Sequence, residues 1–91
     1  MKAREDTATP ATLAELKQLL LRRRKLIPTQ AETVLRFALE RPDIVAFATA
    51  KSLATQCNVA QTTVLRASNL AGFRRFREFR SAFRSYLKNR K

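Results

Sequence analysis

The residues best suited to chemistry in this 91-residue chain lie in a short polar stretch after Asn58. Gln61, Thr62, Thr63 and Arg66 all carry hydrogen-bond donors, and none of them is acidic. An Arg guanidinium pairs with the O6 and N7 edge of guanine, and a Gln amide pairs with the N6 and N7 edge of adenine. A Thr offers either a hydroxyl group to phosphate or a methyl group to thymine. These residue types predict that the segment contacts base edges of double-stranded DNA.

Five further residues are predicted to contact the phosphate backbone. Arg74 and Arg75 follow Gly72, where we expect a helix to begin. The unpaired N–H groups of a helix start, together with basic side chains, favour an anion. The full set of predicted phosphate contacts is Thr49, Lys51, Asn69, Arg74 and Arg75.

The composition argues against catalysis and against metal binding. The chain has no His, which is the commonest general base and the commonest zinc ligand. A single Cys excludes an internal disulfide and a Cys-rich metal site, and a single Gly excludes the glycine-rich loops that hold nucleotide phosphates. We therefore predict that the protein is not an enzyme, has no catalytic or metal-binding residues and uses no cofactor.

The net charge of +12 is distributed unevenly along the chain. The run Arg22–Lys25 contributes four positive charges, and residues 60–91 hold nine basic residues against one acidic residue, Glu78. A localised positive charge of this kind suits a polyanion such as nucleic acid. The alternative is a solvated helix face that keeps a small protein in solution.

No segment has the pattern of a membrane span or of an export signal. The apolar runs are far shorter than the roughly 20 residues that a transmembrane helix needs. No apolar stretch follows the charged residues at the start of the chain. With one unpaired Cys and no export signal, we expect a cytoplasmic protein that does not bind a membrane.

Apolar periodicity predicts an all-α fold, a compact bundle of five to six helices that contains a helix-turn-helix. Residues 1–11 are expected to form a disordered arm, and residues 12–91 a single DNA-binding domain. Thr12 and Thr29 each begin a predicted capping box, and the helix after Thr12 should end near Leu26. Further helices are expected over residues 43–48, 50–57, 61–70 and 74–91, with Ile44, Val45 and Phe47 as core contacts in the first of these.

The stretch from Thr49 to Gly72 has the spacing of two short helices joined by a tight turn. Thr49 is expected to cap the first helix, Asn58 to take the left-handed conformation at the turn, and Gly72 to end the second helix. Small and apolar residues fall where the two helices must pack, at Leu53, Ala54, Cys57, Val59, Val64 and Ala67. This pattern is typical of a DNA-binding helix-turn-helix. A helical corner formed for packing alone is the alternative.

A stripe of aromatic residues runs along the last predicted helix. Its members are Phe73, Phe76, Phe79, Phe83 and Leu87, with Tyr86 beside them. We expect the first three to pack on the chain's own core, and Phe83–Leu87 to meet either the Leu13–Leu20 helix or a second subunit. The stripe leaves open a protein-interaction module or a membrane-surface helix. The basic charge also leaves open a nucleic-acid-binding module without sequence preference.

Several of these residues together resemble the N-terminal domain of the RpiR/MurR family of bacterial transcriptional regulators. The residues that carry the resemblance are Leu53-Ala54, Val59, Thr63–Arg66, Gly72-Phe73, Phe76 and Glu78–Arg80. The resemblance extends without a gap from about Ile27 to Arg84. Ala60 departs from the family pattern, which usually has a Ser helix cap at that position.

The resemblance implies a helix-turn-helix domain that binds operator DNA as a homodimer and represses or activates transcription through operator occupancy. A dimer of this kind should read an inverted repeat. In the family, a C-terminal sugar-isomerase-type domain senses phosphosugars. We therefore expect this chain to be a fragment of a longer regulator, which would respond to a phosphosugar effector only through that missing domain.

Overall fold

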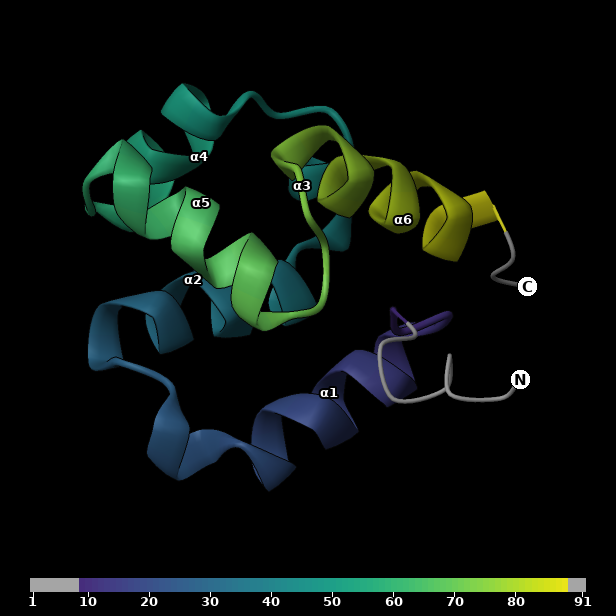
Figure 1. The fold of residues 1–91 in the computed structure, drawn as a ribbon. Coiled ribbons are helices and arrows are strands. Elements are labelled where there is room, and N and C mark those ends of the chain that lie inside the picture. The colour runs from purple at the N-terminus through teal and green to yellow at the C-terminus, as the bar shows by residue number, and fades with distance from the viewer. Residues whose placement is uncertain (1–8, 89–91) are drawn as a thin grey trace.

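The computed structural model describes residues 9–88, which contain six α-helices and one short 3₁₀ helix (Figure 1). In chain order they are α1 (Leu13–Arg22), η2 (Arg24–Leu26), α2 (Thr29–Glu40), α3 (Pro42–Ala46), α4 (Ala50–Cys57), α5 (Gln61–Leu70) and α6 (Phe76–Lys88). No strand occurs between residues 9 and 88, and the predicted all-α fold is confirmed. Residues 1–8, most of the expected arm, lie outside the described residues.

The chain is part of the folded domain from Pro10 onward. Pro10 is buried, and its carbonyl oxygen accepts a hydrogen bond of 2.7 Å from the hydroxyl group of Tyr86 on α6. Thr12 caps α1 as predicted, because its Oγ1 accepts from the backbone N–H of Glu15 at 3.1 Å. The Glu15 carboxylate, however, accepts from the backbone N–H of Ala11 at 2.8 Å instead of closing the box on Thr12. The last two residues assigned to the arm are thus held by the domain.

The boundary between α1 and α2 differs from the prediction. Helix α1 ends at Arg22, and η2 follows it, which leaves the Leu26 side chain 76% exposed. Ile27 is extended, as a residue before Pro28 must be, and this conformation turns its side chain into the core. The α-helix thus ends four residues before the predicted Leu26, and a 3₁₀ turn occupies the residues up to the extended Ile27.

The predicted capping box at Thr29 is wrong. Pro28 occupies the N-cap position of α2 without a side-chain hydrogen bond, and Thr29 is already helical. Glu32, the expected reciprocal partner, forms salt bridges with Arg24 at 3.8 Å and with Arg36 at 3.6 Å. The rigid conformation of Pro28 begins the helix in place of a side-chain cap.

Helix α3 begins at Pro42, one residue before the predicted start, and ends at Ala46, two residues before the predicted end. Val45 is buried and Ile44 is half-buried. Phe47 is not a core residue, since 73% of its surface is exposed. It follows the last residue of α3, and its ring lies against the guanidinium of Arg84, 5.3 Å from centroid to carbon.

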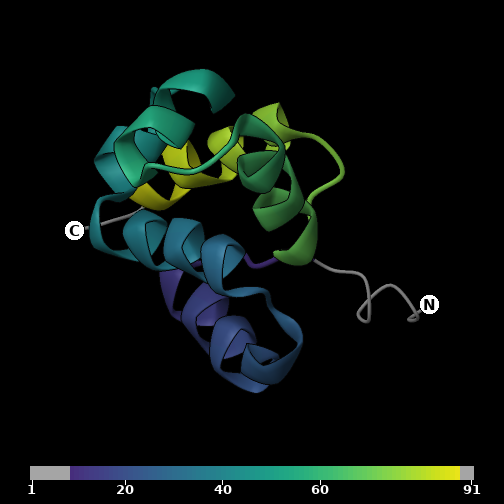
Figure 2. The same ribbon diagram turned by 90° about the vertical axis from the view of Figure 1, so that its left-hand side faces the viewer.

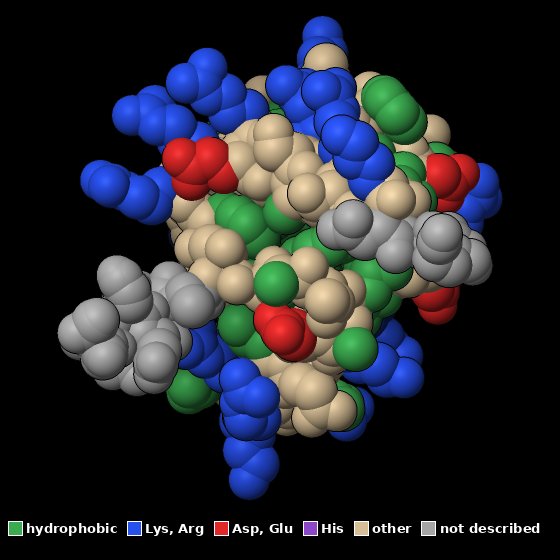
Figure 3. Space-filling model, turned by 90° about the vertical axis from the view of Figure 1, so that its right-hand side faces the viewer, with side chains coloured by type: hydrophobic (Ala, Val, Ile, Leu, Met, Phe, Trp, Pro, Cys, Tyr) green, Lys and Arg blue, Asp and Glu red, His purple; other side chains and the backbone are tan. Residues whose placement is uncertain are grey.

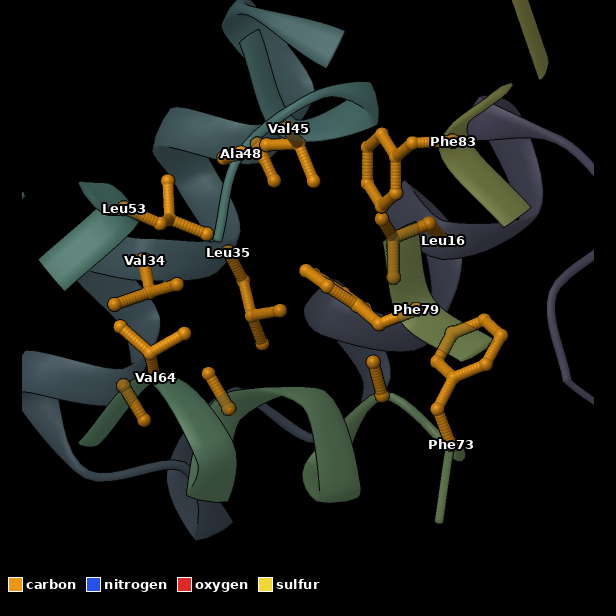
Figure 4. Packing of buried hydrophobic residues seen from close by; sticks show 14 of the residues in the cluster. Leu16, Val34, Leu35, Val45, Ala48, Leu53, Val64, Phe73, Phe79 and Phe83 are labelled. Atoms are coloured by element: carbon orange, nitrogen blue, oxygen red, sulfur yellow. The ribbon is translucent and has the colours of Figure 1, made fainter. Parts of the chain in front are cut away.

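One hydrophobic core joins all six α-helices (Figure 4). Val34 of α2, Leu53 of α4 and Val64 of α5 point toward one another on one side of it. On the other side the rings of Phe79 and Phe83 pack at a tilt of 57° with their centroids 4.9 Å apart, and both are fully buried. The predicted packing of Phe73 and Phe79 on the chain's own core is thus confirmed, and Phe76 is half-buried against it. Phe83 lies in the same core as Leu16 and Leu20 of α1, in agreement with the first of the two alternatives given for it.

The arrangement of the helices leaves α4 and α5 at one end of the molecule. Helix α2 lies between α1 and α4, α5 packs on α2 and α4, and α6 packs principally on α3 (Figure 2). Helix α6 begins at Phe76 and not at Arg74, because residues 73–75 form a linker after α5. The α4–α5 pair therefore rests on the core through its inner faces, and its outer faces meet solvent.

Candidate nucleic-acid interface

The start of α4 carries two of the predicted phosphate contacts on a tightly capped turn. The Thr49 hydroxyl oxygen accepts from the Ser52 backbone N–H at 3.0 Å, and the Ser52 hydroxyl oxygen accepts from the Thr49 backbone N–H at 3.0 Å. This reciprocal box fixes where α4 begins. Thr49 and Lys51 are both exposed there. The reciprocal role of Ser52 was missed, although its position three residues after the cap could have indicated it.

The turn between α4 and α5 forms as the sequence predicts. Asn58 adopts the left-handed conformation, with φ 58° and ψ 47°. The Val59 backbone N–H donates to the Ala54 carbonyl at 3.0 Å, which ties the turn to α4. Val59 is half-buried beside the core, and Ala54 is buried where the helices approach. The two helices thus form a helix-turn-helix.

Helix α5 has the predicted bounds, and the predicted base-contacting residues divide into two groups. Gln61, Thr62 and Arg66 are exposed, whereas Thr63 is half-buried. The opposite face of α5 is buried, through Val64, Ala67 and Ser68. Ala60 forms the N-cap without a side-chain hydrogen bond, in agreement with its departure from the family pattern. Three of the four residues therefore lie on a face that a ligand can reach.

Leu65 also belongs to the outer face of α5 and was missed in the sequence analysis. Its side chain is 40% exposed. The buried positions of the helix follow the i, i+3, i+4, i+7 spacing from Val64 to Ala71, and this spacing excludes Leu65. The sequence therefore held a signal that an apolar residue would remain outside.

The linker after α5 brings three predicted phosphate contacts together. Gly72 has φ 103°, and the Phe73 backbone N–H donates to the Ser68 carbonyl at 3.0 Å, which ends α5. The Asn69 amide nitrogen donates to the carbonyls of Phe73 at 2.7 Å and Arg74 at 3.2 Å. These two bonds use both N–H groups of the Asn69 amide. The remaining polar atom, Oδ1, only accepts hydrogen bonds and therefore cannot bond to a phosphate oxygen, which is also an acceptor.

Arg74 and Arg75 are exposed on that linker and precede α6. The backbone N–H of Arg74 is not free to bind an external anion, because it donates to the Glu78 carboxylate at 3.3 Å. Within residues 9–88 the side chains of Arg66, Arg74 and Arg75 form no hydrogen bond or salt bridge. Their three positive charges are thus available to an external partner.

Basic side chains are also prominent on another face of the molecule. On the side shown in Figure 3, Lys and Arg side chains project at the margins, and acidic side chains lie beside some of them and at the centre of the face. A basic residue near the surface is not always free of a partner within the chain, since Arg80 and Arg84 of α6 donate to backbone carbonyls of the chain itself.

The other candidate features lie outside the outer face of α5. Cys57 is half-buried on α4, and burial raises the pKa of its thiol, as expected of a packing residue. A groove of about 570 Å³ runs between α1 and α2 and is lined by Leu13, Lys17, Leu21, Arg36 and Leu39 among others. No helix within residues 9–88 is both long enough and apolar enough to span a bilayer.

The capped α4, the left-handed turn and the outward face of α5 define a helix-turn-helix domain of the DNA-binding class. The model of the rpiR family of helix-turn-helix domains matches residues 14–90, and the chain belongs to this family. The comparisons with curated proteins and with solved structures found no match. The family resemblance predicted from the sequence is confirmed.

Proposed function

We propose that this domain binds double-stranded DNA in a sequence-specific manner, with α5 in the major groove, as the DNA-binding part of a transcriptional regulator. The observation that carries the proposal is the outer face of α5, where Gln61, Thr62 and Arg66 are exposed and Arg66 has no partner within residues 9–88. Exposed donors of these types beside a basic linker are the side chains that contact base edges and phosphates in protein–DNA interfaces.

Each exposed residue of α5 has a role in this arrangement. Arg66 pairs with the O6 and N7 edge of a guanine, Gln61 with an adenine, and Thr62 with a phosphate or a base. Leu65 is placed to contact a thymine methyl group. Thr63 is half-buried and contributes less direct readout than the other three.

The backbone contacts flank this face. Thr49 and Lys51 approach phosphates from the start of α4, and Arg74 and Arg75 approach them from the linker after α5. For Asn69, the two hydrogen bonds of its amide nitrogen favour a role within the protein over the predicted phosphate contact. We infer that it holds the linker, and with it Arg74, through the two hydrogen bonds of its amide nitrogen.

The alternative of a protein-interaction module on the Phe stripe has little support. Phe73, Phe79 and Phe83 are buried in the core of this chain and cannot also form a docking face. A nucleic-acid module without sequence preference remains the second candidate, because the charge alone would support it.

A competition experiment separates these two candidates. A preferred duplex is first selected from a random pool, and labelled duplex is then competed with preferred and random DNA at one salt concentration. Three base-reading side chains worth about 1–3 kcal/mol each predict a preference of roughly a hundredfold or more. A ratio near one would identify the module without sequence preference.

We also propose that two copies bind one operator with inverted-repeat symmetry. A helix of ten residues reads too few base pairs to find one site among about 10⁶ competitors, and two-fold pairing doubles the site. Leu16, Leu19, Leu20 and Phe83 are buried in their own chain and are excluded from the contact. Leu21 and Leu26 on the α1 side are exposed and are the better candidates.

Sedimentation of the protein on a single preferred duplex tests the stoichiometry. We expect two copies at saturation and a symmetric footprint. One copy with an asymmetric footprint would overturn both the dimer and the inverted repeat, and would leave the sequence-specific binding of one domain intact.

A further inference from the structure

The short connection from α3 to α4 depends on side chains from another part of the chain. Only Phe47, Ala48 and the cap residue Thr49 separate the two helices. Helix α3 is five residues long, so most of its carbonyls have no partner within the helix. The carbonyl of Ala46, at the end of α3, and the carbonyl of Ala48, in the connection, each accept a hydrogen bond from an arginine of α6.

Both bonds are well defined. Arg84 donates from Nε to the Ala46 carbonyl at 2.7 Å, and Arg80 donates from Nη1 to the Ala48 carbonyl at 3.1 Å. Within residues 9–88, these two bonds and the Tyr86 bond are the only side-chain hydrogen bonds that join segments more than five residues apart. Helix α6 is therefore tied to the residues directly before the helix-turn-helix.

Each guanidinium is also held by an aromatic ring. The Arg84 guanidinium lies 5.3 Å from the centroid of Phe47, and the Arg80 guanidinium lies 5.9 Å from the centroid of Phe76. The attraction between a cation and a ring face restricts where the guanidinium can go. It also gives the exposed ring of Phe47 a role, because the ring covers the Arg84 side chain at the α3–α4 junction.

We propose that Arg80 and Arg84 are positioning residues for DNA binding, which fix the α3–α4 junction and through it the start of α4. The proposal rests on the proposed function above. The start of α4 carries Thr49 and Lys51, and its position decides whether these residues meet phosphates while α5 lies in the groove. The two guanidinium groups act within the protein and do not contact DNA.

The test compares two double variants that each remove two positive charges from α6. Arg80→Gln with Arg84→Gln breaks both bonds to the junction. Arg77→Gln with Lys88→Gln is the matched control, because both residues are exposed and form no hydrogen bond or salt bridge within residues 9–88. Circular dichroism verifies folding, and hydrogen exchange of the Ser52 and Leu53 amides reports on the start of α4.

We expect the junction variant to lose about tenfold in its preference for the selected duplex over random DNA, the size of one lost base-pair contact. Its log–log salt slope should lie no more than about 1 below that of the control, because Lys51 is the one charged phosphate contact proposed at the start of α4, and its α4 amides should exchange faster. A preference equal to that of the control would overturn the proposal. So would a log–log salt slope lower by about 2 than that of the control, because that result would assign both arginines to phosphates.

A conservative variant covers the case in which the double variant fails to fold. Arg84→Lys keeps the charge but has no nitrogen at the position of Nε, so a lowered preference supports the proposal and an unchanged preference overturns it. If the wild-type protein showed no preference among duplexes, the proposed function would fail together with the inference. If the wild-type protein shows a preference and only the variants give the contrary result, the positioning role is overturned and the proposed function stands.

Discussion

Arginines of the helix-turn-helix region and arginines of α6 differ in what their guanidinium groups contact. Arg66 and Arg74 form no side-chain hydrogen bond or salt bridge within residues 9–88, whereas Arg80 and Arg84 donate to backbone carbonyls across 32 and 38 residues of sequence. Arg66 and Arg74 are thus free to bind an external partner, whereas Arg80 and Arg84 bind the chain itself, although Arg77 and Lys88 on the same helix form no such bond within residues 9–88. Net charge along a sequence does not distinguish the two uses, but hydrogen-bond geometry does.

The largest effect should come from the aromatic core beneath α6. Phe79 is fully buried and contacts Phe73, Phe76 and Phe83. Phe79→Ala should lower the free energy of unfolding by about 3–5 kcal/mol, through lost burial and the cavity left behind. Denaturant unfolding monitored by circular dichroism measures this change.

Phe47→Ala is the matched control for Phe79→Ala, because it removes the same side chain from an exposed site. We expect it to lower the free energy of unfolding by less than about 1 kcal/mol. Equal losses in the two variants would show that Phe47 packs as a core residue in solution, contrary to its exposed position.

The next effect concerns the free arginine of α5. Arg66→Ala should weaken binding to the preferred duplex by about 1–3 kcal/mol and binding to random DNA much less, because a guanidinium that reads a base discriminates between sequences. Arg36→Ala on α2 removes the same side chain from an exposed position away from the helix-turn-helix. Equal losses of Arg66→Ala on both duplexes would make Arg66 a phosphate contact only.

Local signals allowed much of the fold to be predicted from the sequence. Thr49, Asn58 and Gly72 act through their own backbone and nearest neighbours, and the bounds of α5 follow from them. The exposure of Phe47 could not be predicted, because its packing depends on Arg84, 37 residues later in the chain. A hydropathy pattern shows which residues are apolar, but it does not show which apolar ring packs against a cation from a distant part of the chain.

The candidate site was predictable in its residue types and less so in their use. Gln61, Thr62 and Arg66 are exposed as a helical face would place them. Asn69 is different, since its amide can donate either to phosphate or to a carbonyl, and only the path of the linker brings the carbonyls of Phe73 and Arg74 within reach. Such a choice depends on tertiary structure and leaves no pattern in the sequence.

The linker arginines should affect how binding depends on salt. Arg74→Gln with Arg75→Gln should flatten the plot of log K against log salt concentration by about 2, because two phosphate contacts no longer release counterions. Arg36→Gln with Arg41→Gln removes the same charge from residues that are paired with Glu32 and Asp43. The same slope in both double variants would place Arg74 and Arg75 away from DNA.

The smallest effect concerns Tyr86, the third residue through which α6 holds a distant part of the chain. Tyr86→Phe keeps the ring but removes the hydrogen bond to the buried Pro10 carbonyl. This should lower the free energy of unfolding by about 1 kcal/mol near neutral pH, with little change in affinity for DNA. Denaturant unfolding and a binding isotherm of the same preparation measure the two quantities.

The contribution of Tyr86 to stability should also depend on pH. Burial, helped by the negative charge of Glu15, raises the pKa of Tyr86 to about 12 from its ordinary value of 10.0. The folded state holds this proton more tightly than the unfolded state does, so the stabilisation is complete below pH 10 and is lost as the pH rises toward 12.

The stability difference between the wild type and Tyr86→Phe should therefore narrow over this interval. Deprotonation of Lys and of Cys57 affects both proteins equally and cancels in the difference. A difference that stays constant from pH 9 to pH 12 would mean that the Tyr86 hydroxyl ionises as easily in the folded domain as in the unfolded chain, and that α6 does not bury it against Pro10.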